Sequence, residues 1–401
     1  MTESKRPRIP RGLKPDGLAL WSYGFRPFFL GGAVWAVLTM ALWIAALAHG
    51  LPLGGDFGAP LWHAHEMVFG FAPAVLAGFL LTAIPNWTGS LPVSGRPLIA
   101  LVALWLAGRL AMACAGVIGT VPASVLDAAF LPVFLALCAR EIIRGRKWSD
   151  LKVLAGVLAV CLGNLGFHLA LHLGGDPHLW LRGAVAGYVA LILIIGGRII
   201  PSFTRNWLNQ RGAAPLPVAY NRFDVGVIIA SALVLAIWVV APTTRLIAIP
   251  ALGAAVLNVV RLARWRGLSV RAEWLLLVLH LAYAFVPIGF VAIALASLGL
   301  IGVTSALHVL TVGVIATMML AVMTRATRGH TGRPLTASKL TVTAYLCLFA
   351  AALARPLADL TGLPGLMEAS GALWITAFAI FVAEYGGMLT RVRRKPRAAS
   401  A

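Results

Sequence analysis

The sequence predicts an all-α membrane protein that crosses a lipid bilayer about twelve times, and three observations carry this prediction. Of the 401 residues, 60% are hydrophobic and only 11% are charged, with a mean hydropathy of +0.90. Soluble globular chains carry about 25% charged residues. Apolar runs of about 20 residues, the length that crosses the hydrocarbon core as a helix, recur along the chain. Short basic clusters separate these runs.

The net charge of +20 reflects membrane topology rather than nucleic-acid binding, because no nucleic-acid motif accompanies the basic clusters. Basic residues occupy both chain ends and the segments after even-numbered apolar runs. The segments after odd-numbered runs contain few, and Arg245 is the clearest exception. Since basic loops stay in the cytoplasm, both termini are predicted to be cytoplasmic.

The expected order along the chain is a basic tail (1–22), one membrane domain (23–390) and a second basic tail (391–401). The first apolar run is too long for a cleaved signal peptide and is therefore interpreted as a span. The seventh and eighth spans are the least clearly separated, because only 241–245 divides them. The predicted spans cover 28–48, 66–85, 97–118, 123–143, 151–173, 180–200, 224–241, 246–264, 273–296, 304–324, 338–357 and 368–389.

The second, sixth and tenth spans resemble one another when they are aligned on a glycine. In each, a polar residue stands five positions before the glycine: His65 before Gly70, Arg182 before Gly187, and His308 before Gly313. Such internal similarity indicates repeated units. Three units of four helices fit this spacing better than the two six-helix halves of many transporters. The predicted units cover about 23–148, 149–270 and 271–390.

Histidines gather toward the side of the predicted bundle opposite the termini, where seven of the nine fall. Imidazole is a suitable ligand for copper, zinc and haem iron. Polar groups buried in a bilayer are costly and usually functional. His49 and His178 are expected to be interfacial residues that bind water or a carbonyl. The candidate metal ligands are His63, His65, His168, His172 and His308.

Spacing limits how these histidines can combine. His168 and His172 are four residues apart, so a helix places them on one face. They could serve one metal or two neighbouring centres. His63 and His65 lie about 200° apart around a helix. They converge only if the helix begins between them or the turn is irregular.

Charged residues inside apolar spans form the second group of candidates, because an unpaired guanidinium in a bilayer is expensive. A porphyrin propionate is one natural partner for such an arginine, and Glu66 or Asp127 is the alternative within the chain. Glu66 could instead orient a ligand histidine or carry protons. The candidate cofactor-binding residues are Glu66, Arg109, Arg182 and Arg355.

Six segments spread along the chain carry a family resemblance. They are YGFRPFFL (23–30), WHAHEMVFGF (62–71), GFLLTAIPNWTG (78–89), LWLAGRLA (104–111), HVLTVG (308–313) and MTRATRGHTGR (323–333). In this combination the chain resembles the NnrS family over essentially its whole length. The histidine assignments above come from the residues themselves and not from this resemblance.

The resemblance implies a haem- and copper-containing protein of the bacterial cytoplasmic membrane, linked to nitric oxide metabolism, denitrification and protection from nitrosative stress. The expected partners are nitric oxide or a related small molecule and the lipid bilayer. No nucleic acid and no particular electron donor is implied. Twelve helices in three sets of four also look like the catalytic subunit of haem–copper oxidases. The adjacent His-His pair of those enzymes is absent here, so enzymatic turnover is not assigned.

Two other classes of function are compatible with the same residues. A transporter or metal-handling protein for copper, haem or nitrosyl-metal species would use the histidines and membrane arginines to line a transient route. A sensor or assembly factor for respiratory enzymes is the third hypothesis. Metal that survives dialysis favours a resident metal site, whereas substrate-dependent uptake into vesicles favours transport.

Overall fold

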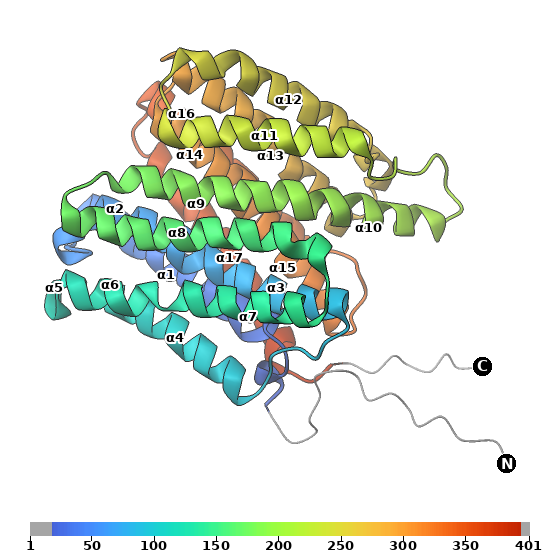
Figure 1. Cartoon of the computed structure of the whole chain (residues 1–401), viewed down its shortest axis with the longest axis horizontal. Coiled ribbons are helices and arrows are strands. Elements are labelled where there is room, and N and C mark those ends of the chain that lie inside the picture. Colours follow the sequence, from blue (N-terminus) through green and yellow to red (C-terminus); the bar gives the residue numbers. More distant parts are fainter. Residues whose placement is uncertain (1–17, 394–401) are drawn as a thin grey trace.

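The chain folds into one bundle of long helices that run roughly side by side (Figure 1). The computed structural model describes residues 18–393, and these contain helices and connecting segments but no strand. Twelve helical spans are long and apolar enough to cross a membrane. The predicted fold class is therefore confirmed, and the chain is a multi-pass membrane protein.

Nine spans contain no π-helical turn. They are formed by α1 (Phe25–His49), α4 (Arg96–Ala113), α6 and α7 (Thr120–Ala128 and Phe130–Arg144), α8 (Leu151–Leu173), α11 (Arg222–Val240), α12 (Ala248–Ala263), α13 (Trp274–Ser297), α16 (Lys339–Thr361) and α17 (Leu366–Thr390). A short helix, α5 (Ala115–Ile118), precedes α6. The predicted break between the seventh and eighth spans is confirmed, since α11 ends at Val240 and a 3-10 turn begins at Arg245.

The second, sixth and tenth spans each contain a π-helical turn, in which the chain holds an extra residue and the ordinary hydrogen-bond ladder is interrupted. They are also the longest spans, with 34, 33 and 28 residues. Their parts are η2, α2, η3 and α3 (Gly55–Phe57, Gly58–His65, Glu66–Phe71 and Ala72–Thr88), α9, η5 and α10 (Pro177–Leu191, Ile192–Gly196 and Gly197–Asn209), and α14, η8 and α15 (Val303–His308, Val309–Ala316 and Thr317–His330).

The π-turns relate two of the three aligned spans. The turn η3 begins directly after His65, and η8 begins directly after His308. In the sixth span, however, η5 follows Leu191 and not Arg182. The repeat of three four-helix units thus stays a prediction, and Arg182 does not share the local backbone of the two histidines.

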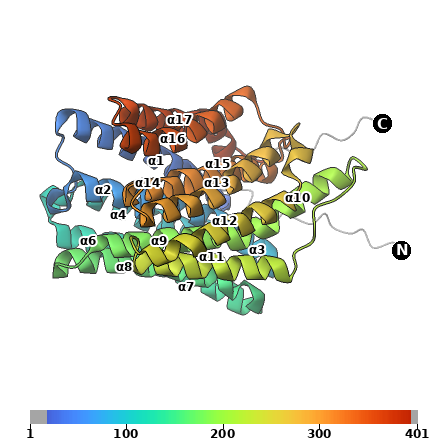
Figure 2. The same ribbon diagram turned by 90° about the horizontal axis from the view of Figure 1, so that it is seen from above.

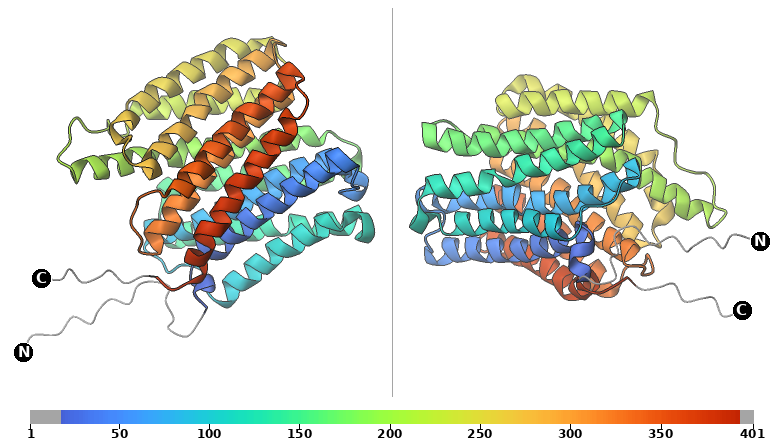
Figure 3. Two further views of the ribbon diagram at one scale, coloured as in Figure 1. Left: turned by 180° about the vertical axis from the view of Figure 1, so that it is seen from behind. Right: turned by 60° about the horizontal axis from the view of Figure 1, so that its bottom comes forward.

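The first and last spans lie beside each other and close the bundle (Figures 2 and 3). Arg26, at the start of α1, donates hydrogen bonds of 2.7 and 2.8 Å to the carbonyl oxygens of Leu389 and Arg391. We call this end of the bundle the terminal end and the opposite end the distal end. In Figure 1 the distal end, with α2, α5 and α6, lies on the left. Which end faces the cytoplasm stays a prediction from the charge pattern.

Candidate metal centre

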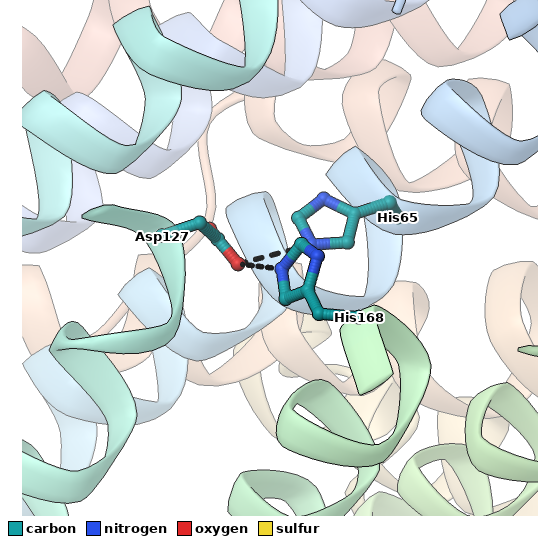
Figure 4. Close-up of side chains that lie close together, drawn as sticks. All are labelled: His65, Asp127 and His168. Atoms are coloured by element: carbon teal, nitrogen blue, oxygen red, sulfur yellow. Dashed lines mark hydrogen bonds and ion pairs between the residues drawn. The ribbon is translucent and has the colours of Figure 1, made fainter. Parts of the chain in front are cut away.

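Five ionisable side chains meet in the distal half of the bundle, and we call them the ionic cluster: His65, Glu66, Arg109, Asp127 and His168. They come from α2, η3, α4, α6 and α8, so four separate spans contribute. None is more than 5% exposed. Figure 4 shows the two imidazoles turned toward the carboxylate of Asp127. An assembly of this kind inside a membrane protein is a candidate functional site.

The local backbone explains how such polar groups fit the interior. His65 and Glu66 stand at the junction of α2 with the π-turn η3, and both side chains are fully buried. Two glycines make room for the charged groups. A Cβ on Gly70 would lie 2.5 Å from Nη1 of Arg109, and one on Gly108 would lie 3.0 Å from the Cα of Asp127. Glycine therefore permits the close approach that the cluster requires.

Arg109 is held between the two carboxylates. Its Nη1 donates to Oε2 of Glu66 at 2.5 Å, and its Nη2 pairs with Oδ1 of Asp127. The indole of Trp35 also donates to Oε2 of Glu66, at 2.7 Å. The guanidinium is therefore compensated by acids of the chain itself.

His65 has a carboxylate oxygen at each ring nitrogen. Its Nδ1 lies 3.0 Å from Oε1 of Glu66, and its Nε2 lies 3.0 Å from Oδ2 of Asp127. A neutral imidazole offers one N–H donor and one lone pair, whereas an ionised carboxylate only accepts. One contact would then set two lone pairs against each other. The conflict disappears if His65 carries a second proton or if a cation lies between Nε2 and Asp127.

The donor set fits a bare metal ion. His168 Nε2 lies 2.8 Å from the same Asp127 oxygen. The donor atoms of His65, Asp127 and His168 all lie within 4.8 Å of one another. Two imidazole nitrogens and a carboxylate suit copper or zinc. Glu66 would then accept the Nδ1 proton of His65, which is the usual way in which a carboxylate orients a ligand histidine.

A porphyrin does not fit at the same place. Axial ligation needs an open face beside the ligand nitrogen, but Nε2 of His65 already has Asp127 at 3.0 Å and Asn164 at 3.4 Å. The His65 ring also packs against Phe167, with ring centroids 5.1 Å apart. The donor set of the ionic cluster therefore suits an ion better than a haem.

A second polar group at the distal end contains three more of the predicted residues, His63, His308 and Arg355. His63 stacks on Trp43, with ring centroids 4.6 Å apart, and lies within electrostatic range of His308 and Arg355. His308 Nδ1 lies 2.8 Å from the carbonyl oxygen of Thr304.

Arg355 already has an acidic partner, because its Nη1 donates to Asp359 at 2.5 Å. It is therefore held within the chain in the same way as Arg109. His63 and His65 do not converge, since the former belongs to this second group and the latter to the ionic cluster.

The remaining predicted residues lie apart from both groups. His172 is exposed, and its Nε2 lies 3.0 Å from the hydroxyl of Ser124. Arg182 donates to the carbonyl oxygen of Val239 at 2.9 Å. Although His168 and His172 share a helix face, only His168 lies deep enough to join the ionic cluster.

Asp127, Asn164 and Trp35 complete the surroundings of His65 and were not among the candidate site residues. The sequence pattern predicts Asp127 only as a partner for an arginine. The sequence does contain a reason to include Asp127 among the candidate site residues, because an acid within an apolar span is costly. Asn164 stands four residues before His168, on the same helix face. Trp35 carried no comparable signal, since tryptophan is common in spans.

Comparison with known proteins agrees with the resemblance noted in the sequence. The family model described as NnrS protein matches residues 19–393, which is nearly the whole chain and includes every residue of the ionic cluster. No curated protein matches the chain. This twelve-span membrane protein belongs to the NnrS family.

Proposed function

We propose that the protein holds a copper ion in the ionic cluster and uses it to bind or process nitric oxide in the bacterial cytoplasmic membrane, as protection against nitrosative stress. Family membership supports the nitric oxide-related part of this function. The metal part rests on one observation. Both ring nitrogens of the buried His65 face carboxylate oxygens, and a second imidazole nitrogen reaches the same oxygen of Asp127.

The charges of the cluster favour a cation of low charge. Glu66 and Asp127 contribute two negative charges and Arg109 contributes one positive charge, so neutral imidazoles leave a net charge of −1. A net charge buried in a medium of low dielectric is strongly unfavourable. One copper(I) ion, or one proton, makes the cluster neutral.

Each residue of the cluster would have a separate role in metal binding. His65 Nε2, His168 Nε2 and the Asp127 carboxylate would hold the metal, and Glu66 would fix the orientation of His65. Arg109 would balance part of the negative charge of both carboxylates. A bound copper ion would supply a coordination position for a small apolar gas that reaches the site through the bilayer. The haem implied by the family does not fit this cluster, and no step is assigned to it.

The competing function is a proton site that uses the same residues. A proton on His65 would give both ring nitrogens a hydrogen to donate, and it would also neutralise the cluster. The alternative function of transport, for copper, haem or nitrosyl-metal species, is less favoured. The cluster is almost completely shielded from solvent, with every member at most 5% exposed, which suits a resident ion better than passing cargo.

Metal analysis of the protein purified in detergent tests the proposal. We expect about one copper per chain after dialysis, and a loss of roughly tenfold or more in His65→Ala and His168→Ala. His172→Ala is the matched control, because this imidazole lies on the same helix as His168 but outside the cluster. Copper that is absent from the wild type, or equal in all four proteins, would contradict the metal site.

Two further measurements separate the alternatives. Infrared or nitrogen-15 NMR spectra that show a doubly protonated His65 in metal-free protein would favour the proton site. Copper uptake into vesicles that depends on His65, without tight binding, would favour transport. Addition of nitric oxide to the copper-loaded protein should change its optical or electron paramagnetic resonance spectrum, and His168→Ala should abolish that change.

A further inference from the structure

A large cavity lies at the terminal end of the bundle, away from the ionic cluster. Its volume is about 420 Å³, within the range of small-molecule binding sites. Residues of α1, α3, α10, α13 and α15 line it. Trp87 lines the cavity, and it lies on the same span as Glu66 at a helical rise of roughly 30 Å from it. The cavity is therefore a separate site.

Aromatic side chains form much of the cavity wall, and an arginine provides its charge. Phe29, Phe79, Trp87 and Phe203 all contribute to the lining. The guanidinium carbon of Arg325 lies 4.3 Å from the centroid of the Phe203 ring. A guanidinium that stacks on an aromatic ring can still donate hydrogen bonds to an anion, because its N–H groups point outward in the guanidinium plane.

Arg325 differs from the other arginines buried or half-buried in the spans. Within 18–393, those arginines donate to carboxylates or backbone carbonyls: Arg26, Arg109, Arg182, Arg205, Arg261, Arg328 and Arg355. No protein oxygen of the same described part of the chain accepts from Arg325. The acid that acts on it from a distance, Glu273, accepts instead from the backbone of Leu275 at 3.1 Å.

A half-buried cation without an acid of the described chain beside it favours an anion from outside the chain, because burying an unpaired charge is costly. We propose that the cavity binds an organic anion. Its carboxylate or phosphate group would accept hydrogen bonds from Arg325, and its apolar body would pack against Phe29, Phe79, Phe203 and Trp87. The ligand could be a membrane phospholipid or a compact organic anion. Both sources offer the same chemistry to the cavity.

Binding of two matched probes tests this site. Full-length protein in discs of neutral lipid is given 1-pyrenebutyrate or the uncharged 1-pyrenebutanol, and the bound probe is counted by native mass spectrometry. We expect the wild type to retain the anion about tenfold more strongly, the scale of one charge-assisted hydrogen bond. Arg325→Gln should remove this preference, and Arg325→Lys should restore part of it.

Substitutions around the cavity provide the controls. Ala83→Phe would fill the cavity and should reduce the binding of both probes, whereas Ala103→Phe, on the exposed face of α4, should not. Arg328→Gln removes a nearby arginine that is paired with Glu384 and does not line the cavity, so the preference should persist. An equal preference in the wild type and Arg325→Gln, or no preference in the wild type, would overturn the proposal. If Arg325→Gln does not fold, the Ala83→Phe variant decides the matter. Probe binding that is as strong in Ala83→Phe as in the wild type would also overturn the proposal.

A second experiment, with discs that contain phosphatidylglycerol, identifies the source of the natural ligand. Displacement of a retained phosphatidylglycerol by 1-pyrenebutyrate in the wild type, but not in Arg325→Gln, would identify a lipid site. Binding of 1-pyrenebutyrate with no retained lipid would identify a site for a compact organic anion. Neither result depends on metal in the ionic cluster, so this proposal and the proposed function can fail separately.

Discussion

At the residue scale, the central feature is an imidazole whose two nitrogens both face acids. Glu66 has three partners, namely Nδ1 of His65, Nη1 of Arg109 and the indole of Trp35. It therefore fixes the ring orientation of His65 without using the nitrogen that faces Asp127. This separation of roles allows the orienting acid and the candidate metal ligands to be tested independently.

Glu66→Gln should weaken metal binding without removing a proposed ligand. An amide oxygen at the Oε2 position can still accept from Arg109 and Trp35, but the amide NH2 group would then face Nδ1 of His65 and could not accept its proton. Arg109 would also be left with one acid. We expect copper affinity to fall about 10- to 100-fold, the usual effect of losing a group that orients a ligand. Competition with a copper chelator measures the change. Glu384→Gln, which alters a half-buried acid of α17 far from the cluster, should leave the affinity unchanged.

The sequence predicted some of this site, and the limits have physical reasons. His65, His168, Glu66 and Arg109 stand out because polar groups are rare in apolar spans. Their assembly depends on how α2, α4, α6 and α8 pack, and spacing along one helix carries no such information. His172 illustrates the limit, since it shares a face with His168 yet lies at the exposed end of α8.

At the element scale, π-helical turns distinguish the three longest spans. The turn η3 leaves backbone groups without their ordinary helical partners, and the sixth span supplies one replacement. The hydroxyl of Tyr188 donates to the carbonyl oxygen of Val68 at 3.0 Å. Since Val68 lies only two residues after Glu66, this hydrogen bond links the irregular backbone of η3 to α9.

Tyr188→Phe should therefore destabilise the protein modestly. The buried carbonyl of Val68 would lose its side-chain donor, at a cost of about 1–3 kcal/mol. Thermal unfolding in detergent should show a lower midpoint, and amide exchange should increase around η3. Tyr220→Phe, in the exposed segment between α10 and α11, is the control. Unchanged exchange in η3 would contradict a role for Tyr188 in holding the turn.

Hydropathy alone underestimates the length of some helices. The predicted sixth and tenth spans ended at 200 and 324, but α10 and α15 continue to Asn209 and His330. Their last turns are polar, so they leave the apolar window while their backbone hydrogen bonds continue. The second span also begins earlier than predicted, because α2 supplies a polar first segment that contains both His63 and His65.

At the scale of the whole molecule, the number of spans and the alternation of basic loops are the most predictable properties. Both depend on the composition of consecutive residues. The neighbours of each span are not predictable in this way. The contact between α1 and α17, for example, joins residues more than 300 positions apart. The indole of Trp374 donates to the carbonyl oxygen of Ala36 at 3.1 Å.

The predicted orientation can be measured directly. A green fluorescent protein fused after Ala401 should fluoresce, and alkaline phosphatase at the same position should be inactive, because the basic ends are expected in the cytoplasm. Fusions that replace the segment between α8 and α9 should give the opposite pattern. Active phosphatase at the C-terminus would reverse the orientation and place the ionic cluster on the cytoplasmic side.

The contact of Arg26 with the carbonyls at the end of α17 has a consequence for chain connectivity. Because the first and last spans are neighbours at one end of the bundle, the order in which the twelve spans are synthesised need not be the natural one. A circular permutant with a flexible linker between the original ends, opened in 210–221, should insert with the same neighbours. Purified permutant that retains the wild-type metal content and a comparable unfolding midpoint would establish this. A permutant that inserts but loses both would show that the ionic cluster depends on the order of insertion as well as on the final packing.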